Sequence, residues 1–255
     1  MAFPKARDDR IVDSCKVNSL LFLLDDVAED MSLDEGKVYY ERMIAIAKGK
    51  IPPKIDAPVE RITYDVWQSL RETDGKLADD VLNGAILCLK AQVHPRRLAC
   101  TDIGKLLEYR AEEGGVAFVA ALMCYSMGLH VPEADLQSID RIHKTYANLG
   151  MTVNDILSLD KEIRAWDDGH KEGASLLNMV IMLGEQLTMS IPATKRILWN
   201  ICREWEIEHA QNVFARLTDR SGCSDELKDY IQGLEYILGG NEAWSWTTGR
   251  YHKRD

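Results

Sequence analysis

Residues 25–30 place four carboxylates within six consecutive positions, as Asp25, Asp26, Glu29 and Asp30. On a helix Asp25 and Glu29 share one face, and Asp26 and Asp30 share another. The apolar run 20–24 comes directly before them, which predicts that this helix is buried up to the acidic end. Carboxylates held so close together repel one another, and hard oxygen ligands suit Mg²⁺. The pattern therefore predicts a magnesium site, with a solvated acidic helix end as the alternative.

A second polar pattern consists of Asn154, Ser158 and Glu162, which are spaced by four residues. This spacing places an amide, a hydroxyl and a carboxylate on one face of a helix. Asn and Ser are mediocre residues for a helix interior, so their presence on the face of Glu162 needs a reason. Oxygen ligands from this face could bind a magnesium ion that also takes substrate phosphate. Lys161 lies beside the face and could reach a phosphate oxygen; the alternative is an ordinary polar helix face.

Together the two patterns resemble the aspartate-rich motif and the N-D-x-x-S-x-x-K-E motif of class I terpene cyclases, in the usual order. The second motif separates cyclases from chain-elongating prenyltransferases, which carry another aspartate-rich motif in that place. Arg110, followed by Glu113 and Gly114, resembles the diphosphate-sensing arginine with its linker and effector positions. Short phrases along nearly the whole chain, such as residues 3–6, 202–206 and 240–242, resemble the fungal class I sesquiterpene cyclases, the aristolochene synthases among them.

This resemblance implies a sesquiterpene cyclase that ionises farnesyl diphosphate and cyclises the carbocation to an aristolochene-like, bicyclic hydrocarbon. It implies three Mg²⁺ ions, two held by Asp25 and one by Asn154, Ser158 and Glu162. The residues that the resemblance implies for diphosphate binding are Arg110, Lys161, Arg250 and Tyr251. The catalytic residues would be Asp25, Arg110, Asn154, Ser158 and Glu162, and the cavity would be lined by Phe22, Cys88 and Trp244.

Two departures from the family pattern affect the expected product. The chain begins where the third or so helix of the family begins, so we expect an N-terminally shortened form of the fold. Cys88 stands where the family carries a cavity aromatic, and a thiol stabilises a cation less well than a ring does. The alternative function is a truncated, catalytically silent terpene synthase paralogue that binds diphosphate or a partner chain.

The elements that must position these residues are almost all helices, because apolar residues recur every three or four positions and strand patterns are nearly absent. We predict about ten helices in one all-α domain over residues 1–255, a class I terpenoid synthase helical barrel. Ser32 with Glu35 predicts a capping box. We expect Gly150 to interrupt one helix and Gly239-Gly240 to end the last one. The predicted ranges are 8–30, 32–49, 59–73, 76–92, 102–110, an apolar segment to 127, 133–148, a helix from Gly150 to 166, 176–189, 192–217 and 225–238.

Composition limits the partners. The 255 residues carry 31 Lys and Arg against 41 Asp and Glu, a formal net charge of −10, which disfavours nucleic acid and anionic membranes. The six cysteines have no C-x-x-C spacing and are expected to be free thiols in a reducing compartment. The first ten residues have no signal-peptide apolar region and no apolar run is long enough to span a membrane, so we expect a soluble, cytoplasmic protein. Members of the family often dimerise, so a homodimer is one expected assembly.

Overall fold

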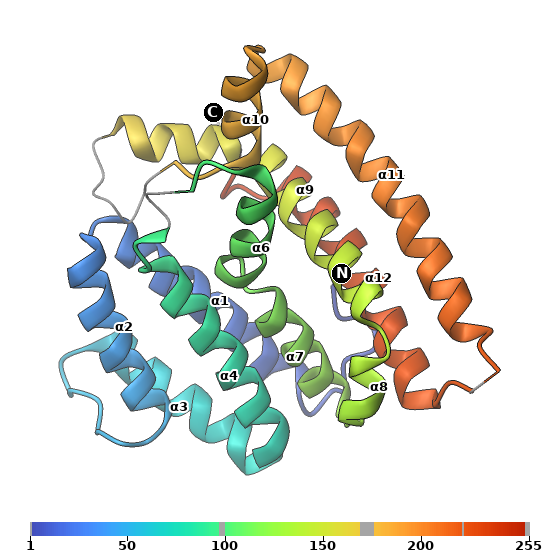
Figure 1. Cartoon of the computed structure of the whole chain (residues 1–255). Coiled ribbons are helices and arrows are strands. Elements are labelled where there is room, and N and C mark those ends of the chain that lie inside the picture. The colour runs from blue at the N-terminus through green and yellow to red at the C-terminus, as the bar shows by residue number, and fades with distance from the viewer. Residues whose placement is uncertain (1, 97–99, 169–175, 221, 253–255) are drawn as a thin grey trace.

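The computed structural model describes residues 2–96, 100–168, 176–220 and 222–252, and all regular elements in these ranges are helices (Figure 1). The predicted all-α class is thereby confirmed. The helices are α1 (Ile11–Glu29), α2 (Leu33–Ala47), α3 (Pro58–Thr73), α4 (Gly75–Gln92), α6 (Ile103–Glu113), α7 (Val116–Met127), α8 (Glu133–Gln137), α9 (Asp140–Asp167), α10 (Met179–Leu187), α11 (Ile191–Leu217) and α12 (Asp225–Thr247).

Local sequence explains where several helices begin. The predicted capping box is confirmed: the Ser32 side chain accepts a hydrogen bond from the Glu35 backbone N–H, and the Glu35 carboxylate accepts one from the Ser32 backbone N–H at 2.9 Å. Asp74, Asp102 and Ser224 cap α4, α6 and α12 in the same way, each with its side chain accepting from a backbone N–H three residues later. These caps satisfy N–H groups that the first turn of a helix leaves without a partner.

Two predicted helix breaks are wrong. Gly150 lies inside α9, which continues to Asp167, and Gly239-Gly240 lies inside α12, which continues to Thr247. An interior glycine costs a helix about 1 kcal/mol relative to alanine, and the packing of α9 against both α11 and α12 outweighs this cost. The predicted helix 133–148 is instead divided near Ser138, with α8 before it and α9 after it.

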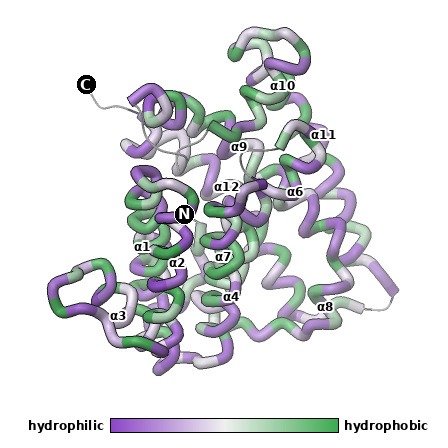
Figure 2. Tube along the Cα trace, turned by 60° about the vertical axis from the view of Figure 1, so that its left-hand side comes forward, coloured by the Kyte–Doolittle hydropathy of each residue, from purple (hydrophilic) through white to green (hydrophobic). Residues whose placement is uncertain are grey.

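The hydrophobic core of the described residues has three parts. One part joins α4, α7, α9 and α12, a second joins α6, α9, α10 and α11, and a third joins α1, α2 and α4. In Figure 1, α9 lies between α6 and the α11–α12 side of the molecule. Figure 2 shows hydrophobic and hydrophilic residues alternating along the helices, as amphipathic helices require.

The helix that carries the acidic residues is buried on one side only. Leu20 and Leu24 of α1 are each 3% exposed, whereas Leu23 is 46% exposed, so the run 20–24 is not buried throughout as predicted. A 3.6-residue period turns consecutive side chains away from one another, so one face of α1 packs on α3 and α7 while the other remains open. The buried residues fix α1 up to the start of the carboxylate cluster.

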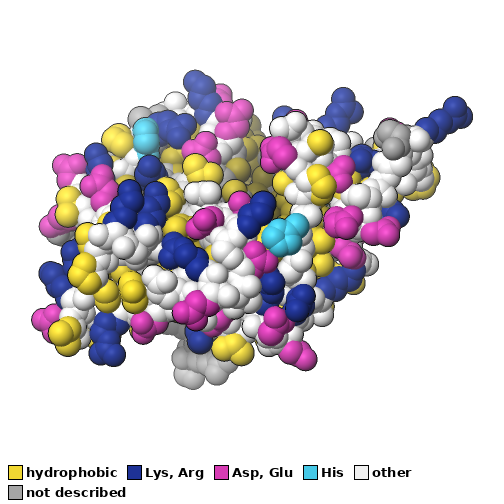
Figure 3. Space-filling view, turned by 90° about the horizontal axis from the view of Figure 1, so that it is seen from below, with side chains coloured by type: hydrophobic (Ala, Val, Ile, Leu, Met, Phe, Trp, Pro, Cys, Tyr) yellow, Lys and Arg dark blue, Asp and Glu magenta, His cyan; other side chains and the backbone are white. Residues whose placement is uncertain are grey.

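The cysteines, the character of the helices and the surface charges add three further facts. All six cysteines are free thiols, as predicted. No helix in the described ranges has the length and apolar character of a membrane span. On the face drawn in Figure 3, acidic and basic side chains are interspersed, and neither sign gathers into a single patch.

Candidate active site

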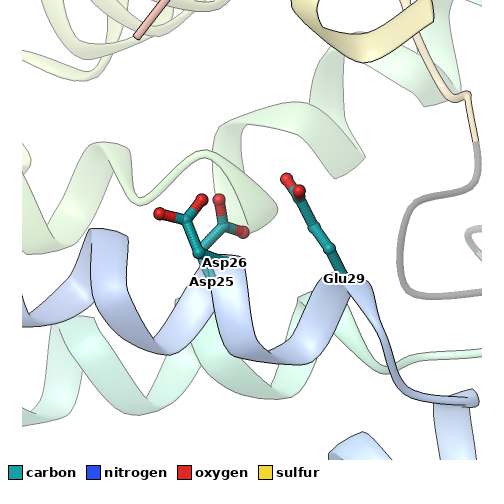
Figure 4. A group of neighbouring side chains, drawn as sticks. All are labelled: Asp25, Asp26 and Glu29. Atoms are coloured by element: carbon teal, nitrogen blue, oxygen red, sulfur yellow. The ribbon is translucent and has the colours of Figure 1, made fainter. Parts of the chain in front are cut away.

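Three carboxylates at the end of α1 point to the same side of the helix (Figure 4). Asp25, Asp26 and Glu29 each offer an oxygen atom, and these atoms lie within 4.8 Å of one another. The i, i+4 relation of Asp25 and Glu29 was predicted from the sequence, and the adjacent Asp26 joins them. An all-oxygen, partly exposed donor set of this kind fits a hard divalent cation such as Mg²⁺.

The second polar cluster lies on α9 along one face. Ser158 Oγ lies 2.5 Å from Glu162 Oε1 and 2.7 Å from the backbone carbonyl oxygen of Asn154, so these two acceptors share its single hydroxyl hydrogen. The Asn154 amide bridges two other residues: its Oδ1 accepts from Arg110 Nη2 at 3.3 Å, and its Nδ2 donates to the Tyr251 hydroxyl at 2.8 Å. The donor set of amide, hydroxyl and carboxylate oxygens also fits a hard cation.

Arg110 is a buried cation held between two carboxylates. It is 9% exposed, donates to Glu113 at 2.5 Å, and donates to Asp155 Oδ1 through Nε at 3.0 Å and also through Nη2. Burial alone would lower the pKa of the guanidinium, but Asp155 and Glu113 outweigh it and raise that pKa well above its ordinary value. Arg110 therefore stays charged, with its fork fixed in direction.

The other predicted diphosphate-binding cations contact the acidic end of α1. Arg250 Nη2 lies 3.0 Å from Asp25 Oδ2, and Arg250 Nη1 lies 2.7 Å from Asp26 Oδ1. Lys161 forms an ion pair with Glu29. These pairs connect the chain end and α9 to α1 across the cavity, so residues far apart in sequence form one polar site.

Tyr251 completes this polar side. It is 6% exposed, and burial raises the pKa of its phenol to about 12. Its hydroxyl therefore remains protonated at neutral pH and is able to donate to an anion.

The polar groups line a cavity of about 220 Å³, whose walls include Phe22, Asp25, Cys88, Arg110 and Asn154. A more apolar cavity of about 470 Å³ adjoins it and shares Phe22, Asn154 and Tyr251 with it. Trp244 lines this second cavity, and its ring stacks on Phe22 with 5.5 Å between centroids. The guanidinium group of Arg250 lies over the ring of Phe22, with its Cζ atom 4.9 Å from the ring centroid.

Cys88 lies in the wall of the polar cavity. It is 5% exposed, and its thiol donates to the backbone carbonyl of Glu113 at 3.0 Å. Burial raises the pKa of the thiol well above its ordinary value, so it is neither a thiolate nor a nucleophile at neutral pH.

Sequence reasoning missed three residues that hold the predicted ones in place. Asp155 is fully buried beneath Arg110, Gln92 Nε2 donates to Asp25 Oδ1 at 3.3 Å, and Asn178 Nδ2 donates to Glu162 Oε2 at 3.0 Å. Asp155 was visible as the second residue of the Asn-Asp pair. Gln92 and Asn178 had no signal, because their partners lie 67 and 16 residues away.

Comparison with known proteins gives consistent matches. The family described as "Terpene synthase family 2, C-terminal metal binding" matches residues 16–208. Aristolochene synthase of Penicillium roqueforti is 44% identical over 250 residues, 98% of this chain and 73% of that protein. Aristolochene synthase of Aspergillus terreus is 41% identical over 249 residues, 98% of this chain and 78% of that protein. The crystal structure of the Penicillium roqueforti enzyme superposes with a TM-score of 0.83 at 41% identity, covering 97% of this chain and 82% of that one.

Proposed function

We propose that this chain, which belongs to the terpene synthase family, is a sesquiterpene cyclase that ionises farnesyl diphosphate and closes the carbocation into a bicyclic, aristolochene-like hydrocarbon. The family match and the superposition also confirm the predicted class I terpenoid synthase fold. The observation that carries the proposal is one cavity system in which two oxygen donor sets, three basic side chains and an apolar chamber meet.

The family is named for metal binding, and the residues present fit Mg²⁺. Asp25 would hold two ions, with Asp26 and Glu29 beside it in the same cluster, and Asn154, Ser158 and Glu162 would hold a third. When bound, the metal would neutralise the diphosphate so that it can leave as an anion. Both donor sets contain only oxygen, which favours Mg²⁺ over softer metals.

The basic side chains bind and orient the diphosphate. Arg110 presents a fixed guanidinium fork, Lys161 a point charge, and Arg250 and Tyr251 donors from the chain end. Arg250 and Lys161 now neutralise Asp25, Asp26 and Glu29, so they exchange carboxylate partners for phosphate oxygens when the ligand enters. Donors aimed at a developing negative charge in a water-poor site are worth far more than in water.

The apolar chamber receives the hydrocarbon chain. Phe22 lines both the polar and the apolar cavity, and its ring stacks on Trp244, which lines the apolar one. Aromatic faces stabilise a nearby cation. No covalent attack by the protein is required, because departure of diphosphate creates the reactive carbon centre. Excluding water from the chamber protects that carbocation from quenching.

The alternative readings are weaker. A silent paralogue has no reason to retain both oxygen donor sets and the basic side chains around one cavity. A chain-elongating prenyltransferase is disfavoured by the amide of Asn154 and the hydroxyl of Ser158 where that class has carboxylates. We also propose a homodimer, which sedimentation or light scattering of the purified chain would test.

The direct test is incubation of the purified chain with farnesyl diphosphate and Mg²⁺, followed by hydrocarbon extraction and mass spectrometry. We expect one dominant cyclic sesquiterpene and no turnover when EDTA is added. Linear alcohols would show that ionisation proceeds but that water reaches the cation, against the proposed cyclisation. Absence of diphosphate release would contradict the proposed function.

A further inference from the structure

Asn178 lies buried at the start of α10, next to the second oxygen donor set. It is 1% exposed, and its Oδ1 accepts from the Val180 backbone N–H at 2.8 Å, which caps the helix. Its Nδ2 donates twice, to the Asp155 backbone carbonyl at 2.9 Å and to Glu162 Oε2 at 3.0 Å. One side chain therefore joins the N-terminus of α10 to two turns of α9.

The contact with Glu162 completes the fixation of that carboxylate. Ser158 Oγ donates to the other oxygen, Oε1, at 2.5 Å. Both oxygens of Glu162 thus have a donor from a well-buried residue, and Ser158 is itself 3% exposed. A carboxylate held at both oxygens has its plane fixed before any ligand binds.

Asp155 accepts a second hydrogen bond from the start of α10. The Met179 backbone N–H donates to Asp155 Oδ2 at 2.8 Å, while Asp155 Oδ1 accepts from Arg110. Asn178 therefore holds Glu162 in place. The backbone of Met179 holds Asp155, which in turn holds Arg110.

Helix capping does not account for this choice of residue. Ser, Thr or Asp would accept the Val180 N–H equally well. Among the residues preferred as helix caps, only asparagine offers that acceptor together with two N–H donors, and an aspartate would place a second carboxylate against Glu162. The amide group is needed for the contact with Glu162, not for the cap.

We propose that Asn178 is a positioning residue that orients Glu162 for metal binding. The inference rests on the proposed function, in which Glu162 binds Mg²⁺ together with Asn154 and Ser158. Asn178 touches neither metal nor substrate and acts through Glu162. Partners of this kind commonly contribute about 10–100-fold in metal affinity.

The test compares Asn178→Ser and Asn178→Asp with the wild type in calorimetric titrations with Mg²⁺ and inorganic diphosphate. Both variants keep the cap, so helicity should change little. Both lose the buried amide donors, so their thermal midpoints should fall, and Mg²⁺ affinity should fall about 10–100-fold. Asn200→Asp, the same change at an exposed position of α11, is the matched control and should bind like the wild type.

A double substitution separates positioning from stability. If Asn178 acts through Glu162, adding Asn178→Ser to Glu162→Gln should cost little more affinity than Glu162→Gln alone. If both Asn178 variants bind Mg²⁺ with wild-type affinity, whatever their thermal midpoints, Asn178 serves only as a helix cap. That result would overturn the inference and leave the proposed function intact. Failure of the wild type to bind Mg²⁺ with diphosphate would overturn both.

Discussion

Asp25 is held by two neighbours that remain when its side chain is removed. Gln92 donates to one oxygen and Arg250 to the other, and Asp25 itself is only partly buried. We expect Asp25→Ala to lower turnover of farnesyl diphosphate by about 10²–10³-fold or more, because a ligand of the metal that would neutralise the leaving diphosphate is lost. Circular dichroism should show unchanged helicity. Asp65→Ala, at an exposed position of α3, is the control; near-normal turnover in Asp25→Ala would contradict the metal assignment.

Arg110 differs from Asp25 because its loss affects folding as well. Removing the guanidinium leaves Asp155 and Glu113 buried without their cation. We expect Arg110→Ala to destabilise the chain by about 3–5 kcal/mol, measured by denaturant unfolding, with Arg110→Lys less affected because the charge is kept. The deficit of Arg110→Ala should shrink at acidic pH, where the two carboxylates become protonated. A deficit independent of pH would argue against an electrostatic cause.

At the level of the helices, α2 and α3 are joined by a clamp at Glu60. Arg42 donates to both Glu60 oxygens at 2.6 and 2.7 Å, and the Lys54 backbone N–H donates to one of them at 2.8 Å. The hydrogen bonds from Arg42 lower the pKa of Glu60 to about 2. Since the folded-state pKa is below the unfolded one, this stabilisation is present above about pH 4.5 and is lost as the pH falls towards 2.

The matching prediction concerns Glu60→Gln. We expect it to lower unfolding free energy at pH 7 by about 1–3 kcal/mol, the usual worth of hydrogen bonds to a charged group. The difference in unfolding free energy between Glu60→Gln and the wild type should become smaller as the pH is lowered from about 4.5 to about 2. Urea unfolding at several pH values measures this, with exposed Glu41→Gln as the control. An equal loss of unfolding free energy in Glu60→Gln and Glu41→Gln would contradict the proposed stabilising role of the Arg42–Glu60 contact.

The adjacent glycines Gly239 and Gly240 of α12 give a matched pair of substitutions. A methyl group on Gly240 would lie 2.7 Å from the Ala2 backbone, whereas one on Gly239 would meet nothing within 4 Å. We expect Gly239→Ala to stabilise the helix by about 0.5–1 kcal/mol and Gly240→Ala to destabilise the chain by displacing the N-terminal segment. Thermal unfolding measures the difference in stability between the two variants. Equal thermal midpoints would show that the N-terminal segment around Ala2 moves aside without cost.

These glycines also show what the sequence could and could not predict. Periodicity and caps located most helices and placed Asn154, Ser158 and Glu162 on one face, because such patterns depend on neighbours three or four residues apart. The continuation of α12 past Gly240 is supported by packing against α9, whose residues lie far away in sequence. Gln92 and Asn178, which donate to Asp25 and Glu162, likewise come from other elements, so local patterns contain no information about these two contacts.

For the whole molecule, the arrangement of ion pairs determines how ligands stabilise the fold. Arg250 and Lys161 already neutralise Asp25, Asp26 and Glu29 across the cavity. Mg²⁺ alone must compete with these cations for the carboxylates, and diphosphate alone meets basic groups that are already paired. When both are present, the carboxylates pass to the metal and the basic side chains to the phosphate oxygens. Binding should therefore be synergistic.

We expect neither Mg²⁺ nor diphosphate alone to raise the thermal midpoint appreciably, whereas both together should raise it. At 100 times the dissociation constant, ligand binding contributes about 2.7 kcal/mol, which corresponds to roughly 5–10 °C for a chain of this size. Differential scanning fluorimetry measures the shift, EDTA should abolish it, and Asn154→Ala should show little of it because one donor set is incomplete. An equal shift with diphosphate alone would mean that the basic side chains bind anions without the metal, and the partner exchange across the cavity would then be wrong.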